Sequence, residues 1–215
     1  MNRSPQLIVK RFLDVLIATA GLLLLWPVFV LIAVCIKISS PGPVFFSQER
    51  AGRRGKLFRI LKFRTMVGNA DRIGTGLYVS QDDPRITRVG KLLRRFSFDE
   101  LPQLLHIVAG KMSLVGPRPG LPYHLERYTA EQSRRLLLRP GLTGWSQVNG
   151  RNLLTWPERI ERDVWYVDNF SLLLDARILL RTFAVWISAD GLYAPRDRFF
   201  FSAQEDIPAP SRKGS

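Results

Sequence analysis

The sequence RRFSFDELPQLLHIVAGKMSLVGPRP spans residues 94–119 and contains the most informative group of charges in the chain. Two neighbouring carboxylates, Asp99 and Glu100, lie within it, with arginines on both sides. Pro102 removes a backbone donor and restricts the residue before it, so regular helix is expected through QLLHIVAG rather than through DELP. Adjacent side chains of a regular helix diverge by about 100°, so an irregular or terminal turn is needed if both carboxylates are to face one ligand.

An ionised carboxylate pair at a helix start is suited to phosphate chemistry. One carboxylate can attack phosphorus, while the other holds a divalent metal ion that neutralises phosphate charge. Neighbouring arginines and the helix dipole predict that both acids stay ionised. The spacing also fits a capping box, in which Ser97 and Glu100 satisfy backbone N–H groups. Because caps are much commoner than active sites, the spacing alone favours the cap.

A similarity that extends over most of the sequence changes the balance between a capping role and a catalytic role for these acids. Residues 97–119 resemble the signature of the bacterial sugar transferases, the monotopic phosphoglycosyl transferases that start glycan assembly on a polyprenyl phosphate. The likeness extends, in order and at compatible spacing, to KRFLDVLIATAGLLLL (10–25), FRILKFRTM (58–66), RPGLTGWSQVNGRN (139–152) and YVDNFSLLLDARILLRT (166–182). Since the similarity covers most of the chain, it is far more specific than any single motif, and it favours catalysis over capping.

The resemblance implies an enzyme that moves a phosphosugar from a UDP-sugar to polyprenyl (undecaprenyl) phosphate, releasing UMP. It implies Asp99 as the nucleophile of a covalent phosphosugar intermediate and Glu100 as the ligand of a Mg²⁺ cofactor. It also implies substrate-binding roles for Lys62, Arg94, Gln103, Arg118, Gln147 and Arg151. For Arg118 the sequence adds a physical reason, because the prolines on either side restrict the loop and reduce the ordering cost of binding.

The N-terminal region predicts a membrane anchor. The run from Phe12 to Ile36 is almost entirely apolar and is long enough to cross a bilayer, but Pro27 lies near its middle and is expected to bend it. Basic residues flank both ends, which favours two cytoplasmic ends and hence a re-entrant helical hairpin. A single span is the alternative. A cleaved signal peptide is disfavoured because the run is too long and no A-x-A-like site follows it.

One residue in this anchor departs from the family pattern. Family members often have a small polar residue before the proline of the bend, whereas Trp26 occupies that position here. A tryptophan could anchor near the membrane interface or fill space between the helix arms. Pro27 and the flanking charges therefore carry the prediction of a re-entrant bend.

The predicted fold class is α-rich α/β, divided into a membrane anchor (1–38), a catalytic domain on the cytoplasmic face of the bacterial inner membrane (39–194) and a loosely ordered tail (195–215). Residues 43–66 read as strand, basic turn and strand. Helices are expected over 86–96, over 155–166 after a capping box, and over 172–187. The last helix is amphipathic, and it fits either a core helix or one lying among lipid headgroups.

The composition of the chain limits which alternative functions are possible. The net charge of +14 implies acidic partners, which can be nucleic acid, anionic lipid or a phosphorylated substrate. A membrane-tethered nucleic-acid-binding or anionic-lipid-binding protein without catalysis is the alternative function, although no helix-turn-helix, zinc-finger or RNP motif is present. A catalytically silent scaffold is disfavoured by the intact acidic pair. The sequence does not decide whether the protein forms a homodimer. It also does not decide which sugar is transferred, with an N-acetylated amino sugar or a hexose as candidates.

The cysteine and histidine residues add little chemistry. Cys35 is the single cysteine, so no intrachain disulfide can form, which fits a reducing cytosolic side. His106 lies in an apolar helix, where a hydrogen-bonded core residue is the commoner role, and His124 has no supporting motif. Without a Cys/His cluster, a structural zinc site is not expected.

Overall fold

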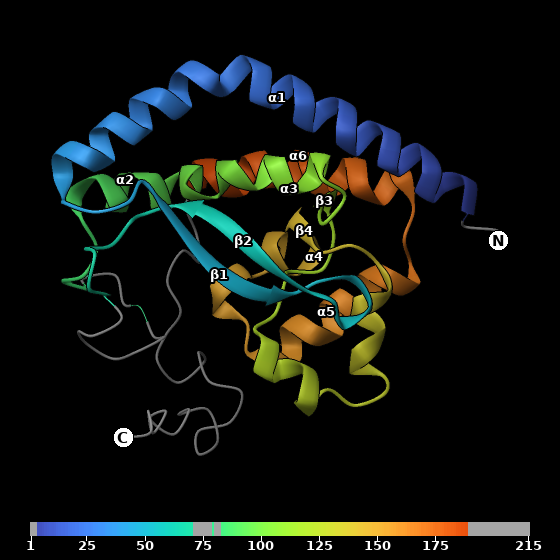
Figure 1. Ribbon diagram of the computed structural model, residues 1–215. Coiled ribbons are helices and arrows are strands. Elements are labelled where there is room, and N and C mark those ends of the chain that lie inside the picture. The colour runs from blue at the N-terminus through green and yellow to red at the C-terminus, as the bar shows by residue number, and fades with distance from the viewer. Residues whose placement is uncertain (1–3, 71–78, 80–82, 189–215) are drawn as a thin grey trace.

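The computed structural model describes residues 4–70, 79 and 83–188. The tail predicted at 195–215 lies outside the described residues. One long helix, α1 (Ser4–Ser39), lies along one side of a mixed α/β domain (Figure 1). The α-rich α/β class predicted from the sequence is therefore confirmed.

Helix α1 is a single continuous helix of 36 residues with Pro27 inside it. Its axis bends, so the helix forms an arch over the domain (Figure 1). The two arms do not fold back against each other, as the predicted hairpin would require. The physical reason is that an internal proline removes one hydrogen bond and bends the axis, which does not by itself end the helix.

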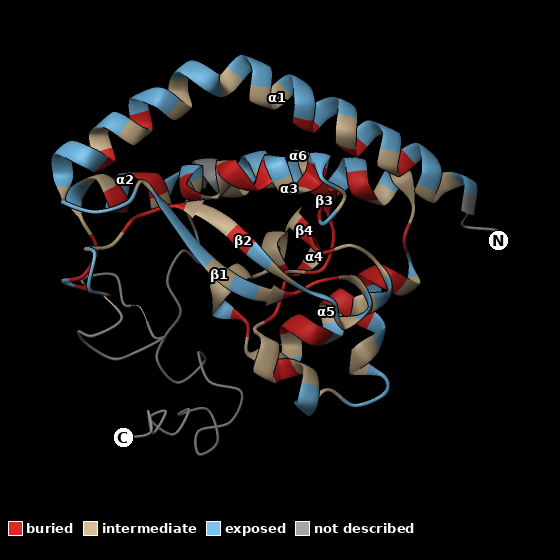
Figure 2. Ribbon diagram, in the orientation of Figure 1, coloured by how far each residue is buried: buried red, intermediate tan, exposed pale blue. Residues whose placement is uncertain are grey.

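The two sides of α1 differ in burial. The side that faces the domain is packed, with Ala18 and Ile36 almost completely buried. The outer side carries exposed apolar residues, among them Leu24 at 78% and Trp26 at 62% exposure (Figure 2). This is the only described helix that is long and apolar enough to cross a membrane.

Two small sheets lie beneath α1. Strands β1 (Phe45–Ala51) and β2 (Leu57–Phe63) pair antiparallel around the turn η1 (Arg53–Gly55), which confirms the predicted strand, turn and strand. Strands β3 (Ser113–Val115) and β4 (Gly141–Thr143) form a parallel pair that the sequence did not predict. A Cβ atom on Gly141 would lie 2.1 Å from the backbone nitrogen of Gly116, so this close approach requires glycine.

Short helices connect these strands to the rest of the domain. Helix α2 (Arg88–Arg95) is capped by Thr87 and leads into the 3₁₀ turn η3 (Phe98–Gln103) and helix α3 (Leu104–Val108). After β3 come η4 (Pro122–Arg127) and η5 (Gln132–Leu137). Helix α4 (Trp145–Val148) and turn η6 (Arg151–Leu153) follow β4.

The two C-terminal helices complete the core. Helix α5 (Trp156–Asp168) starts with the predicted capping box, in which Thr155 and Glu158 bond each other's backbone N–H groups. Helix α6 (Leu172–Ser188) buries Ile178 completely, together with Ile107, Met112 and Tyr166 from other elements. Leu173 and Leu180 of the same helix are 81% and 73% exposed. Helix α6 is thus a core helix on one side and has an exposed apolar surface on the other.

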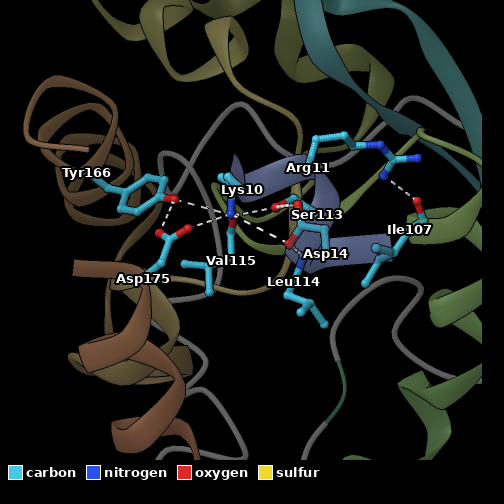
Figure 3. Close-up of polar contacts among 9 residues, drawn as sticks. All are labelled: Lys10, Arg11, Asp14, Ile107, Ser113, Leu114, Val115, Tyr166 and Asp175. Carbon is cyan, nitrogen blue, oxygen red and sulfur yellow. Dashed lines mark hydrogen bonds and ion pairs between the residues drawn. The ribbon is translucent and has the colours of Figure 1, made fainter. Parts of the chain in front are cut away.

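Polar contacts fix the N-terminal arm of α1 to the domain (Figure 3). Lys10 forms a 2.6 Å ion pair with Asp175 of α6. Asp14 accepts hydrogen bonds from the hydroxyl of Ser113 and the backbone N–H of Leu114, at 2.7 and 3.0 Å. Because these groups are buried, their pairing matters more than it would at the surface. These buried contacts bind the N-terminal arm of α1 to the domain.

Candidate active site

The acidic pair lies in η3, an irregular turn between two regular helices. Ser97, the residue before this turn, has φ of 55° and makes no capping hydrogen bond. Its hydroxyl instead accepts a 2.9 Å hydrogen bond from Nη2 of Arg151. The capping-box interpretation is therefore wrong. The placement of DELP outside regular helix is confirmed, and it leaves Asp99 and Glu100 free to face the same cations.

Two cations from other elements converge on Glu100. Nζ of Lys62, on β2, lies 2.6 Å from Oε1 of Glu100 and 3.9 Å from Oδ2 of Asp99. Nη2 of Arg118, in the proline-flanked loop after β3, lies 3.1 Å from the same Oε1. The structure thus brings together Lys62, Asp99, Glu100 and Arg118, four residues to which the resemblance assigns site roles. They form what we call the acidic cluster.

The pKa values of the two carboxylates in this cluster are shifted in opposite directions. Burial raises the pKa of Asp99, and the charge of Glu100 adds to that effect, while Lys62 opposes both. Burial also disfavours ionisation of Glu100, but Lys62 and Arg118 outweigh it and hold the pKa of Glu100 well below its usual range. Burial therefore opposes ionisation of Asp99, whereas the cations outweigh burial at Glu100.

Two further predicted arginines border the acidic cluster. Arg94, at the end of α2, donates a 2.8 Å hydrogen bond from Nε to the hydroxyl of Thr65, and its charge lowers the pKa of Asp99. Arg151 is held by Ser97 at the other side. Burial and the charge of Arg118 lower the pKa of Arg151, while Glu100 and Asp99 act in the opposite direction. These contacts surround two carboxylates with four cationic side chains, an arrangement suited to binding phosphate groups.

The two predicted glutamines are placed differently. Gln103 belongs to η3 and is only 2% exposed, and its Nε2 has no hydrogen-bond partner among the described residues. Gln147 lies on α4, where its Oε1 accepts a hydrogen bond from Ser146 and its Nε2 is also unpartnered in the described structure. Neither residue makes a hydrogen bond to Asp99 or Glu100 within the part of the chain that is described. Both are buried amide donors without acceptors.

Sequence reasoning missed two cations near the site. Arg50 of β1 is influenced by the charges of Arg118 and Glu100, and burial lowers its pKa to about 10. Burial and the charge of Arg118 likewise lower the pKa of Arg159 on α5 to about 10. Arg50 lies within the basic residues that follow the apolar run, which the sequence suggested only as flanking charge. Strand alternation alone could not show which of these arginines points inward.

A family model, described as bacterial sugar transferase, matches residues 5–189. This chain belongs to the bacterial sugar transferase family. Its relatives include the uncharacterized sugar transferase EpsL of Bacillus subtilis, which is 44% identical over 187 residues, or 86% of this chain and 91% of EpsL. The exopolysaccharide production protein ExoY of Sinorhizobium fredii is 42% identical, over 86% of this chain and 88% of its own length.

A longer relative has a more specific name. The UDP-glucose:undecaprenyl-phosphate glucose-1-phosphate transferase of Xanthomonas campestris is 42% identical over 85% of this chain, and the match covers 40% of that protein. Together with the family model, these similarities identify the present sugar transferase as an enzyme. The resemblance stated from the motifs is therefore confirmed.

The acidic cluster of this sugar transferase is compatible with a bound Mg²⁺ ion. No group of three or more His, Cys, Asp or Glu side chains is arranged to hold a metal among the described residues. Mg²⁺ does not need one, because it is commonly held by one or two carboxylates together with water and substrate phosphates. Asp99 and Glu100 are neighbouring hard oxygen donors, and Lys62 and Arg118 both bond a single oxygen of Glu100. Glu100 is the residue we expect to hold the ion.

The remaining predicted residues lie apart from the acidic cluster. Trp26 and Pro27 are exposed on the outer side of α1. Trp26 therefore does not fill space between two helix arms. His106 accepts a 3.0 Å hydrogen bond at Nε2 from the backbone N–H of Leu61, and burial lowers its pKa. His106 is therefore hydrogen-bonded, as expected of a core residue, although its side chain is only half-buried.

Proposed function

We propose that this sugar transferase moves a phosphosugar from a UDP-sugar to membrane polyprenyl phosphate, producing polyprenyl diphosphate sugar and UMP. The observation that carries the proposal is the bonding of Lys62 and Arg118 to Glu100, directly beside Asp99. This arrangement combines a buried carboxylate with a concentration of positive charge, as attack on a diphosphate requires. The names of relatives from Xanthomonas and Escherichia coli support the same reaction class.

In the first proposed step, a carboxylate oxygen of Asp99 attacks the β-phosphorus of the UDP-sugar. A new bond forms between this oxygen and phosphorus, and the bond from phosphorus to the bridging oxygen breaks. The electron pair leaves with UMP, and the phosphosugar stays on Asp99. Lys62 and Arg118 are placed to offset the negative charge that develops, because both already bind an anionic oxygen next to the nucleophile.

In the second proposed step, an oxygen of polyprenyl phosphate attacks the same phosphorus. The bond to Asp99 breaks, which restores its carboxylate and releases polyprenyl diphosphate sugar. Arg94 and Arg151 border the cluster on two sides and are suited to hold the phosphate groups of donor or acceptor. Mg²⁺ bound at Glu100 would offset diphosphate charge and stabilise the leaving UMP.

The anchor supports a one-sided arrangement on the bacterial inner membrane, with the catalytic domain in the cytoplasm. A helix of 36 residues is about 54 Å long, whereas a span of the hydrocarbon core needs about 20 residues. Its N-terminal arm is bonded to α6 through Lys10, and its C-terminal arm packs Ile36 in the cluster that contains Phe63. Because both arms contact one domain, we infer a re-entrant helix whose outer, apolar side enters one leaflet.

The names of the relatives narrow the choice of sugar that is transferred. Two relatives carry glucose in their names and others carry galactose. These names favour a hexose over the N-acetylated amino sugar that the sequence left open. We therefore expect UDP-glucose or UDP-galactose to be the better donor.

The test is UMP release by the full chain in detergent, with and without undecaprenyl phosphate and Mg²⁺. The donor panel contains UDP-glucose, UDP-galactose, UDP-N-acetylglucosamine and UDP-N-acetylgalactosamine. We expect metal-dependent release with one donor, abolished by Asp99→Asn and by Glu100→Gln. Glu161→Gln, an exposed acid on α5, is the matched control and should retain activity.

Two results would overturn this proposal. Turnover by Asp99→Asn equal to that of the unaltered chain would exclude the covalent step. No UMP release with any of the four donors, in protein that is folded, would exclude these substrates. Binding of duplex DNA that does not depend on donor or metal would instead support the nucleic-acid-binding alternative.

A further inference from the structure

A second group of cations lies away from the acidic cluster, where the N-terminal arm of α1 meets the domain. A cavity of about 300 Å³ opens there, close to the lower limit of roughly 300 Å³ for small-molecule sites. Its charged side is formed by Arg11 of α1, Arg53 of η1 and Arg139, which directly precedes Pro140 and β4. Its apolar side is formed by Leu7, Ile8 and Leu138.

The three arginines are held in place by backbone carbonyl groups. Arg11 donates to the carbonyl oxygens of Ile107 and Val108 at 2.6 and 3.0 Å, and Figure 3 shows the bond to Ile107. Arg53 donates from Nε to Leu137 at 3.0 Å. Arg139 donates from Nε to Gly110 at 2.9 Å. Because carbonyl groups carry no net charge, these bonds fix the guanidinium groups without neutralising them.

Arg11 and Arg139 meet at Gly110. The carbonyl of Gly110 accepts from Arg139, and a Cβ atom built on Gly110 would lie 3.4 Å from Nη2 of Arg11. Burial, followed by the charges of Arg11 and Arg53, lowers the pKa of Arg139. The charges of Arg11 and Arg53 thus both act unfavourably on the charge of Arg139, and an anion bound beside Arg139 would offset that repulsion.

The acidic group in this cavity is already engaged. Asp14 lines the cavity and favours the charged form of Arg139. However, it accepts hydrogen bonds from Ser113 and Leu114, and it lies 3.8 Å from Lys10 (Figure 3). Within the described part of the chain, none of the three arginines has an ion pair with an acidic side chain. The cavity therefore has an excess of fixed positive charge.

We propose that this cavity is a phosphate-binding site, separate from the acidic cluster, in which Arg11, Arg53 and Arg139 surround the phosphate group. Arginine is suited to this task because its planar group binds phosphate oxygens in pairs. The phosphate belongs either to the headgroup of an anionic lipid or to a soluble phosphate. The apolar side formed by Leu7, Ile8 and Leu138 favours the lipid, since Ile8 is 71% exposed on the helix that we infer to enter the membrane.

The experiment measures binding by the full chain in neutral detergent, without donor or acceptor, so its result does not depend on the proposed reaction. Phosphatidylglycerol, phosphatidylcholine and inorganic phosphate are titrated separately, with chloride added to equal ionic strength. Thermal unfolding and lipid retention in native mass spectrometry are the readouts. We expect phosphatidylglycerol to raise the unfolding temperature and to be retained, and phosphatidylcholine to do neither. Stabilisation by inorganic phosphate at least equal to that by phosphatidylglycerol would identify the soluble source.

Variants then locate the site. Arg53→Gln and Arg139→Gln each remove a charge-assisted contact and should weaken binding about tenfold. Arg53→Lys keeps the charge and should retain part of the affinity, which separates loss of charge from loss of folding. Arg54→Gln, in the same turn but exposed and outside the cavity, should bind normally. Equal losses in Arg53→Gln and Arg54→Gln, or no binding of either phosphate compound by the unaltered chain, would overturn the proposal.

Discussion

Lys10 of α1 and Asp175 of α6 form a buried ion pair of 2.6 Å, although 165 residues separate them in the sequence. The other oxygen of Asp175 accepts a 2.6 Å hydrogen bond from the hydroxyl of Tyr166 (Figure 3). Tyr166 in turn lies 3.4 Å from the carbonyl of Val115, on the strand that leads to Arg118. The anchor is thus linked through hydrogen bonds to the segment that supplies a cation to the active site.

Breaking this pair should destabilise the whole protein. Lys10→Met leaves two buried carboxylates without their cation, and Asp175→Asn leaves a buried ammonium group without its closest acid. Either loss is expected to cost about 3 kcal/mol, because one partner of a buried pair becomes uncompensated. Urea unfolding in detergent measures the free energy directly. Lys37→Met, at the exposed C-terminal end of the same helix, should change the free energy of unfolding by less than about 0.5 kcal/mol.

The pH dependence of UMP release should reflect the environment of Asp99. Burial raises its pKa above the ordinary range of aspartate, so the nucleophile becomes protonated at a higher pH than an exposed carboxyl would. As the pH is lowered, the rate should therefore begin to fall at a pH above about 4, where free aspartate titrates. If the acidic limb of the pH–rate profile lay at or below about pH 4, the assignment of Asp99 as the titrating nucleophile would be contradicted.

Removing the charge of Lys62 should move the acidic limb of the pH–rate profile to higher pH. Lys62 is the strongest favourable charge acting on Asp99, so Lys62→Met raises the pKa of Asp99 further. The maximal rate should also fall, by about 100-fold, because a cation that stabilises phosphate charge is lost. Rates of UMP release across pH, measured for both proteins, provide the comparison. Lys56→Met, an exposed lysine in the turn before β2, should leave the limb unchanged.

Much of the site could be predicted from the sequence because it is built from local features. Pro102 excludes regular helix from DELP, and the structure has a 3₁₀ turn there. Lys62 lies on the second predicted strand, and only the resemblance to a family identified it as a substrate-binding residue. The partners of Glu100 come from β2 and from the loop after β3, and spacing alone does not show that these elements meet.

Other features depend on tertiary packing and could not be predicted. Strands β3 and β4 are three residues long and pair through a backbone approach at Gly116 and Gly141, which has no hydrophobic pattern. Arg135 of η5 has a charged side chain, which is ordinarily expected at the surface. It is instead 2% exposed in a 3₁₀ turn and is paired with Asp163. A charge is buried this way only when a distant partner compensates it.

Ser97→Gly distinguishes a binding role for Ser97 from a capping role. Ser97 has φ of 55°, a conformation that favours glycine, so this change should raise the free energy of unfolding by about 0.5 kcal/mol. A true N-cap would instead lose a few tenths of a kcal/mol. The hydroxyl that orients Arg151 is lost, so KM for the UDP-sugar should rise. Thermal unfolding and donor kinetics on the same sample measure both effects.

The re-entrant arrangement predicts that both ends of α1 are inaccessible from outside the cell. The test uses Pro5→Cys, an exposed position in the first turn of α1, in a Cys35→Ser background, so that it carries the single cysteine. A membrane-impermeant maleimide should leave this cysteine unlabelled in intact cells and label it after the membrane is permeabilised. A single span with a cytoplasmic catalytic domain predicts labelling from outside.

A second cysteine serves as the control for this experiment. Glu161→Cys, on the exposed surface of α5, reports the side of the catalytic domain in the same background. The two cysteines should be labelled together, and only after permeabilisation, because Lys10 and Arg11 bind the N-terminal arm of α1 to the domain. Labelling of the cysteine at position 5 alone in intact cells would show that these contacts do not hold in the membrane, and the helix would then cross it.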